Sequence, residues 1–205
     1  MTHHLFTIGH SAMECGVFLK LLQKFEIKLV MDVRSRPRSQ RYPQFDEVEL
    51  DGTLREAGIR YLLQGEELGG RPEDPKEYRN DGLVDYCARR KSRGFAVGME
   101  RVLAELESGD LALMCAEEDP LSCHRFLMIC PELVAAGIAP LHIRKGGILE
   151  TQHAAEDRLL NLHKMAAVAG ESLFPEDRQV ALESAYVEQS KKYGFRIDAR
   201  ELEMW

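Results

Sequence analysis

Residues 111–136, LALMCAEEDPLSCHRFLMICPELVAA, contain the local patterns that decide the fold. The apolar run at 111–114 predicts a buried β-strand, and the acidic residues that follow it predict a loop. The apolar segment after Cys123-His124-Arg125 predicts a helix, which Pro131 should kink or interrupt. A strand, a loop and a helix in this order are the unit from which α/β folds are built.

The same alternation extends to both sides of this stretch. Strands are expected at 5–8, 28–33, 59–63, 111–114 and 139–143, and helices at 17–25, 45–57, 75–93 and 99–107. Connections that are long enough to hold a helix join parallel strands by right-handed crossovers. We therefore predict an α/β fold in three layers, with a mostly parallel sheet of about five strands between flanking helices.

The strand patterns end near Thr151, and only helices are expected after it. Segments 156–168 and 175–192 have helical patterns, and Phe174-Pro175 is typical of a helix start. We predict an α/β domain over residues 1–150, which carries the candidate cleft, and a helical extension over residues 151–205. The extension is expected either to pack on the α/β domain or to form a homodimer.

Composition and charge restrict the class of protein. The net charge of −7 disfavours indiscriminate binding of nucleic acid but leaves room for a local basic patch. No apolar run reaches the length of about 18 residues that a membrane helix needs, and the N-terminal residues lack the features of a signal peptide. We expect a cytoplasmic protein without a membrane partner.

The cysteines are spaced irregularly. They are Cys15, Cys87, Cys115, Cys123 and Cys130, and no two of them form a C-x-x-C pair. This odd set is typical of reduced thiols and disfavours both a disulfide framework and a structural zinc site.

Polar or glycine-rich segments follow each expected strand. They are residues 9–11, 32–38, 68–71, 115–125 and 144–146. In open parallel sheets, ligands bind beyond the carboxyl ends of the strands. We therefore expect these segments, although distant in sequence, to form one cleft.

Four motifs in these segments are those of a known family. They are TIGHS at 7–11, DVRSRPRSQRYPQF at 32–45, IRYLLQGEELGG at 59–70 and LMCAEEDPLSCHR at 113–125. With them, the chain resembles domain-of-unknown-function family 488 over residues 5–145, although Ala12 stands where the family often has Asn. The resemblance implies an α/β domain with these residues in one cleft. It implies no established activity, and some relatives carry DNA-repair labels.

Cys123 is the first candidate for chemistry. It should lie near a helix N-terminus that is capped by Ser122 or Asp119. The helix dipole and the neighbours His124 and Arg125 would lower the pKa of the thiol and make it a nucleophile or a redox-active group. The alternative is a small buried cysteine that packs under the loop.

His10 and Glu117 complete the candidate catalytic set with Cys123 and His124. Imidazole titrates in the range that acid–base catalysis needs, although His10 is equally suited to capping a turn. A metal held by Asp32, Glu117, His10 and His124 is compatible with the residue types, but the spacing gives no coordination signature. No metal ligand and no cofactor are therefore predicted.

Arg34 and Arg125 are the main candidates for binding an anion. Guanidinium groups match the oxygens of phosphate or carboxylate, and the alternative for both is an internal salt bridge with Asp32 or Glu117. The rest of the predicted ligand-binding set comprises Ser11, Asp32, Arg38, Ser39, Gly69 and Gly70. The glycine pair is equally suited to a tight turn.

Cys115 at the end of a strand resembles the start of a phosphatase-like or rhodanese-like loop. Glu117, Glu118 and Asp119 would repel a phosphate there, and the arginine comes too late in the loop. We set this hypothesis aside.

Three functions remain open from the sequence. The best supported is a cleft that acts on a phosphate-bearing ligand, either a nucleotide or a nucleic acid, because of the arginines between 34 and 41. The alternatives are a thiol-dependent enzyme that uses Cys123 and a non-catalytic ligand-binding module. Whether the chain is an enzyme is left open.

Overall fold

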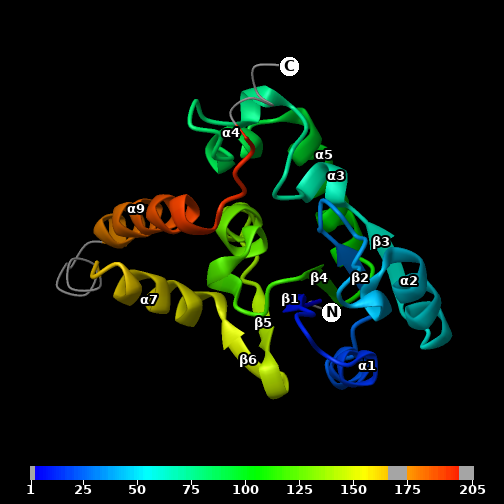
Figure 1. Ribbon diagram of the computed structural model, residues 1–205. Helices are drawn as coiled ribbons and strands as arrows, with labels where there is room; N and C mark the ends of the chain where they lie inside the picture. Colours follow the sequence, from blue (N-terminus) through cyan, green and yellow to red (C-terminus); the bar gives the residue numbers. More distant parts are fainter. Residues whose placement is uncertain (1–2, 166–174, 199–205) are drawn as a thin grey trace.

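A computed structural model of the protein describes residues 3–165 and 175–198. At its centre is a six-stranded sheet with the strand order β3-β2-β4-β1-β5-β6 (Figure 1). The strands are β1 (Leu5–Gly9), β2 (Leu29–Asp32), β3 (Arg60–Leu63), β4 (Leu111–Cys115), β5 (Leu141–Arg144) and β6 (Ile148–Thr151). Neighbouring strands are parallel except for β6, which is antiparallel to β5. The predicted mostly parallel sheet is confirmed.

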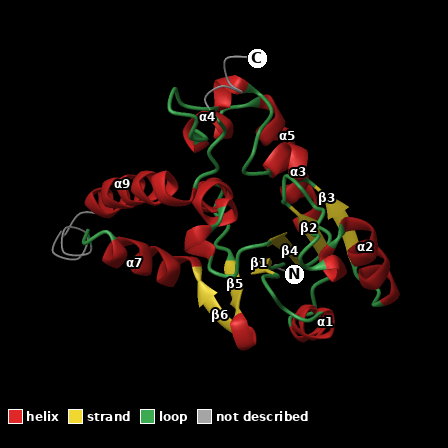
Figure 2. Cartoon of the chain, viewed as in Figure 1, coloured by secondary structure: helices red, strands yellow, loops and turns green. Residues whose placement is uncertain are grey.

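Helices cover both faces of the sheet (Figure 2). They are α1 (Cys15–Lys24), α2 (Glu47–Glu56), α3 (Gly65–Leu68), α4 (Tyr86–Arg90), α5 (Arg93–Leu106), α6 (Cys130–Ala135), α7 (Gln152–Leu162) and α9 (Pro175–Tyr193). Helices α1 and α2 pack on one face, and α5, α6, α7 and α9 contribute to the core on the other. The three-layer α/β architecture is therefore as predicted.

Strand β4 shows how the sequence produces two cores. Leu111 and Leu113 point to the face that α5 and α6 cover, whereas Ala112 and Met114 point to the face that α1 and α2 cover. Because side chains alternate along a strand, a strand that is buried on both faces must be apolar throughout. The apolar run that opens the 111–136 stretch meets this demand.

The segment between Pro75 and Arg93 differs from the prediction of one helix, which was wrong. Only Pro75–Glu77, a 3-10 turn called η2, and α4 are helical, and Tyr78 forms an antiparallel bridge with Val84. The chain reverses between them at Gly82, where φ is +77°, a conformation that favours glycine. This turn forces the chain out of a helical path.

Strand β6 was not predicted, because it carries little sequence signal. It is an edge strand with three of its four side chains exposed, so it needs no apolar pattern. The turn before it, Lys145–Gly147, contains two glycines with positive φ, Gly146 at +77° and Gly147 at +75°. This short connection allows the antiparallel pairing.

The C-terminal helices pack on the α/β part of the chain. Leu159 of α7 and Leu182 and Ala185 of α9 belong to the same core cluster as α5 and α6, and Gln189 donates a hydrogen bond to the carbonyl of Leu121. Helix α7 begins and ends earlier than the predicted 156–168, of which residues 166–168 lie outside the described ranges, as do residues 199–205. Within the described ranges, no helix has both the length and the apolar character to cross a bilayer.

Candidate functional site

The carboxyl ends of three adjacent strands, β2, β4 and β1, meet at one edge of the sheet. The amide of Val33 donates to the carbonyl of Met114 (3.0 Å), and the amide of His10 donates to the carbonyl of Cys115 (2.9 Å). Gly9 makes the close approach feasible, since a Cβ there would lie 1.7 Å from the carbonyl oxygen of Glu117. The loops that follow these strands therefore lie against each other, as the sequence predicted.

A cleft of about 350 Å³ opens at this edge. Its walls come from five parts of the chain: residues 34–38 after β2, residues 70–71 after α3, Tyr86 of α4, residues 115–124 from the end of β4 onward, and residues 193–195 from the end of α9 onward. The side chains that matter for its chemistry are Arg36, Arg38, Arg71, Tyr86, Cys115, Glu117, His124, Tyr193 and Phe195.

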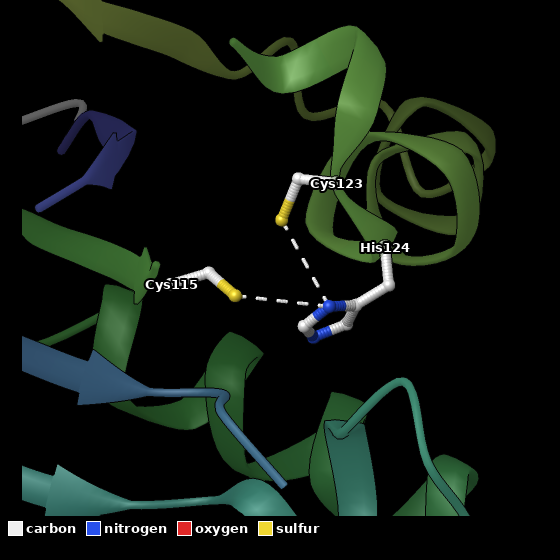
Figure 3. A group of neighbouring side chains, drawn as sticks. All are labelled: Cys115, Cys123 and His124. Atoms are coloured by element: carbon white, nitrogen blue, oxygen red, sulfur yellow. Dashed lines mark hydrogen bonds between the residues drawn. The ribbon is translucent and has the colours of Figure 1, made fainter. Parts of the chain in front are cut away.

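Cys115, Cys123 and His124 form a compact cluster at the bottom of this cleft. Figure 3 shows the two sulfur atoms directed at the same ring nitrogen of His124. The distance from His124 Nδ1 is 3.8 Å to each sulfur, and the three polar atoms all lie within 4.8 Å of one another. The three atoms therefore face a common point.

A backbone contact sets the tautomer of His124. Its Nε2 lies 2.9 Å from the carbonyl oxygen of Val33, which is an acceptor only, so Nε2 carries a hydrogen and donates it. In the neutral ring, Nδ1 then presents its lone pair to the two sulfurs. Gly70 gives the ring its space, because a Cβ there would lie 2.8 Å from His124 Cγ.

The charges around the cluster separate the two thiols. Although burial opposes its ionisation, the pKa of Cys123 is held well below its ordinary value by a hydrogen bond from Cys115, by the nearby Arg125 and by the protonated form of His124. The Cys123 thiolate in turn raises the pKa of His124 against the effect of burial. That same hydrogen bond and burial raise the pKa of Cys115. Cys123 is therefore the thiol that ionises first.

The local fold explains how Cys123 reaches this position. Asp119 caps the 3-10 turn η3 (Pro120–Ser122) by accepting from the amide of Leu121, so of the two predicted caps Asp119 is the one that acts. Cys123 is then extended, and its carbonyl accepts from the amides of Phe126 and Leu127. A π-helical turn, η4 (Arg125–Ile129), leads into α6, in whose first turn Pro131 lies. The helix continues through Pro131 to Ala135, and its irregular part is the π-helical turn that precedes the proline.

Arg125 lies inside the protein and serves the loop that crosses above it. Its Nη1 and Nη2 donate to the carbonyls of Glu117 and Glu118, its Nε donates to Thr7 Oγ1, and the residue is 1% exposed. These contacts agree with the alternative role of Arg125, an internal partner for the loop. Its acceptors are backbone carbonyls, whereas the carboxylate of Glu117 was expected. The guanidinium group of Arg125 is therefore not exposed in the cleft and cannot bind an anion there.

Arg34 is also engaged internally. Its Nε and Nη2 donate to both oxygens of Asp32, its Nη1 donates to the carbonyl of Phe45, and the residue is 6% exposed. Asp32 additionally accepts from the hydroxyl of Tyr61. The internal salt bridge with Asp32 was one of the two roles expected for Arg34.

His10 is occupied on both ring nitrogens. Nδ1 lies 3.0 Å from the carbonyl of Ser11 and Nε2 lies 3.3 Å from Arg34 Nη1, while the ring stacks on Phe45 at 4.2 Å. Burial and the charge of Arg34 lower the pKa of His10 to about 4. The turn-capping alternative fits these contacts better than acid–base catalysis does.

The acidic loop presents one carboxylate to the cleft. Glu118 pairs with Arg144 of β5, and Asp119 pairs with Arg158 of α7, so both charges are matched. Glu117 lines the cleft, with its Oε2 3.0 Å from Cys115 Sγ, and burial raises the pKa of its carboxyl group.

Of the remaining predicted ligand-binding residues, two line the cleft and three lie outside its lining. Ser11 is one of the latter, and its amide donates to the carbonyl of Ala116. Arg38 is exposed and lines the cleft, and Gly70 lines it as well. Ser39 accepts from the amide of Tyr42 within its own loop, and a Cβ at Gly69 would lie 2.3 Å from Ser35 Oγ. Gly69 therefore serves a close approach of two loops, which agrees with the turn alternative.

Two residues of the cleft were not among the predicted ligand-binding residues. Arg71 belongs to segment 68–71, which was expected to join the cleft, whereas Phe195 lies in the extension and had no signal in the sequence. The Arg71 guanidinium stacks on the Phe195 ring at 4.6 Å. An antiparallel bridge between Leu83 and Arg196 holds this terminal segment beside the cleft. Such a contact between distant segments leaves no local pattern.

A family model described as "Domain of unknown function DUF488" matches residues 14–129. The chain belongs to this family. In this DUF488 chain, the matched part includes Arg36, Arg38 and the whole Cys115–Cys123–His124 cluster, whereas β1, α7 and α9 lie outside it. No curated protein matches the chain, and no solved structure matches it.

Proposed function

We propose that the cleft binds a phosphate-bearing ligand, and that the anion is held by Arg36, Arg38 and Arg71. The observation that carries the proposal is the charge of the cleft walls: these three arginines are exposed around one cavity, and Glu117 is the acidic side chain among the lining residues. Guanidinium groups bind phosphate oxygens through paired N–H donors. The predicted anion site therefore moves outward from Arg34 and Arg125.

The aromatic side chains of the cleft favour a nucleotide over a bare phosphate. Tyr86, Tyr193 and Phe195 line the same cavity, and the rings of Tyr193 and Phe195, which are not buried, provide a surface on which a base can stack. Stacking on Phe195 uses the face of the Arg71 guanidinium and leaves its N–H edges for an acceptor. The volume of about 350 Å³ lies within the range of small-ligand sites.

The other two predicted functions have less support. Cys123 is 1% exposed and is not among the residues that line the cleft, which disfavours direct attack on a substrate by its thiol. A non-catalytic binding module would use the same arginines, so the binding experiment applies to it as well. The DNA-repair association rests on the family resemblance and would require the cleft to accept a nucleic acid.

A titration with matched charge variants tests the proposal. Calorimetry at low salt would compare adenosine monophosphate, inorganic phosphate and a short single-stranded DNA. The triple variant R36A/R38A/R71A removes the cleft arginines. The control, R55A/R93A/R101A, removes three exposed arginines outside the cleft and changes the net charge equally.

We expect the cleft variant to lose at least about tenfold in nucleotide affinity, because charge-assisted hydrogen bonds to phosphate are lost. The control should bind as the wild type does. Equal losses in both triple variants, or no binding of any probe to the wild type, would reject the proposal. Binding of DNA alone, with a steep salt dependence, would assign the cleft to nucleic acid instead.

A further inference from the structure

We propose that Cys115, Cys123 and His124 bind one Zn²⁺ ion at the bottom of the cleft. The cluster spans the end of β4 and the start of the helical segment after η3. Thiolate sulfur and imidazole nitrogen are the ligands that zinc prefers in proteins. This site does not depend on the proposed nucleotide, since none of its ligands is one of the three cleft arginines.

The distances within the cluster match those that a zinc ion imposes. With Zn–S distances of about 2.3 Å and Zn–N distances of about 2.0 Å, a tetrahedral ion sets its sulfur and nitrogen ligands about 3.5 Å apart. The two observed distances from sulfur to His124 Nδ1 are 3.8 Å. The two sulfurs lie within 4.8 Å of each other. A shift of no more than about 1 Å would bring them to the separation of about 3.8 Å that a tetrahedral zinc ion sets between two sulfur ligands.

The histidine is held as a ligand before any ion arrives. Metal-bound imidazoles usually donate their second N–H to a carbonyl or carboxylate, which fixes the tautomer and the ring orientation. Here Nε2 donates to the carbonyl of Val33, and Nδ1 faces the sulfurs. Gly70 packs closely against the ring, since a Cβ there would lie 2.8 Å from Cγ and 3.1 Å from Nδ1, so His124 has little freedom to turn toward it.

The electrostatic surroundings also favour a cation. Two thiols buried to 4% and 1% exposure, with the carboxylate of Glu117 against Cys115, form a site that cannot hold two thiolates without a compensating charge. A divalent ion between them supplies that charge, whereas Arg125 alone supplies only half of it. Zinc binding would therefore stabilise the thiolate forms of Cys115 and Cys123, whose ionisation is otherwise opposed by burial.

The site is of the open kind. It offers three protein ligands, and Cys115 and His124 both line the cleft, so a fourth position would face the cavity. Structural zinc sites have four protein ligands, whereas three ligands and an open position are typical of catalytic zinc. Glu117 lies beside that position and is suited to accept a proton from zinc-bound water.

Cobalt substitution provides a direct test on the full-length chain. The protein would be reduced, stripped with a chelator and titrated with Co²⁺ and then Zn²⁺. We expect one ion per chain, a near-ultraviolet charge-transfer band from thiolate to Co²⁺, and strong visible bands of tetrahedral Co²⁺ that disappear as Zn²⁺ replaces it. An octahedral spectrum without the charge-transfer band would overturn the proposal.

Cysteine variants assign the ligands. C115S and C123S should each weaken zinc binding by more than about a hundredfold, since even outer-shell changes cost 10- to 100-fold. C87S and C130S remove one exposed and one buried thiol outside the cluster and should bind zinc as the wild type does. Retention of wild-type affinity in C115S/C123S would contradict the site.

Two further variants keep the result interpretable if a cysteine variant folds poorly. Gly70→Ala leaves all three ligands in place but pushes on the ring of His124, and should lower zinc affinity without abolishing the thiolate band. R36A/R38A/R71A should bind zinc normally. Unchanged zinc affinity in G70A, together with loss of zinc binding in R36A/R38A/R71A, would place the ion elsewhere. Nucleotide binding is measured in a separate titration, so the two proposals can fail independently.

Discussion

Two pairs of arginines lie at the same edge of the sheet and have opposite surroundings. Arg34 and Arg125 are buried, and each makes hydrogen bonds to protein oxygens through all three of its guanidinium nitrogens. Arg36 and Arg71 are exposed and line the cleft. Arg34 fixes the loop from which Arg36 projects, and Arg125 fixes the acidic loop that follows β4. Residues of one type therefore serve internal structure in one pair and face the cleft in the other.

The difference teaches that partners, more than residue type, decide what a charged side chain does. A buried charge has to be paired, and once paired it is removed from ligand binding. The buried set continues beyond Arg125: Thr7 lies between Arg125 Nε and His142 Nδ1, and His142 Nε2 contacts Gln152 at the start of α7. This chain of polar contacts links the cleft loop to the C-terminal helices.

The largest difference in stability between the buried and the exposed arginines is expected when the partner of a buried arginine is removed. Asp32→Asn should lower the free energy of unfolding by about 3–5 kcal/mol, because Arg34 would keep a buried charge without a counter-charge. Urea denaturation measures the effect. Arg36→Ala, two residues away and exposed, should stay within about 0.5 kcal/mol of the wild type. Similar losses in both variants would remove the distinction.

A second test uses pH on the buried set. Burial and the nearby Arg125 lower the pKa of His142 to about 4, and the residue is 0% exposed. Between pH 6.5 and 4 the unfolded chain therefore binds a proton that the folded chain excludes, so the free energy of unfolding falls as the pH falls.

Between pH 7 and 5, this one histidine should account for about 2 kcal/mol of lost stability. Denaturation curves at both pH values for the wild type and His142→Gln would measure it, because the variant should lose about 2 kcal/mol less over that interval. An identical pH dependence in the two proteins would show that His142 is protonated in the folded state.

Within the exposed set, two arginines of one loop should differ. Arg38 lines the cleft and Arg41 does not, although both are exposed. Arg38→Ala should weaken adenosine monophosphate binding about tenfold, which is a loss of about 1.4 kcal/mol, and Arg41→Ala should leave it unchanged. Calorimetry at low salt decides, and equal effects would mean that the loop acts through its net charge alone.

The smallest expected effect is a gain. Glu117→Gln removes the carboxylate from the cleft wall and should tighten adenosine monophosphate binding by about 0.5–1 kcal/mol in the metal-free protein. The measurement is the same titration, repeated at higher salt, where the gain should shrink. Weaker binding in E117Q would mean that Glu117 contacts the ligand by donating or accepting a hydrogen bond.

Much of the fold follows from local sequence. The strands β1, β2 and β4 are short apolar runs because they are buried on both faces, and the helices between them have clear apolar stripes. Strand β6 and the segment 75–93 were mispredicted because their structure depends on edge pairing and on a turn at Gly82. The π-helical turn at Arg125–Ile129 has no local signature either.

The sequence by itself determined the α/β architecture and the edge of the sheet at which polar residues gather. Only the tertiary structure decided which arginines are buried, that Phe195 joins the cleft, and that Cys115 faces Cys123 and His124 across the loop. The physical reason is the separation in sequence of the residues that interact. Periodicity and turn chemistry act between neighbours in the chain, whereas burial and coordination depend on segments that meet only when the sheet has formed.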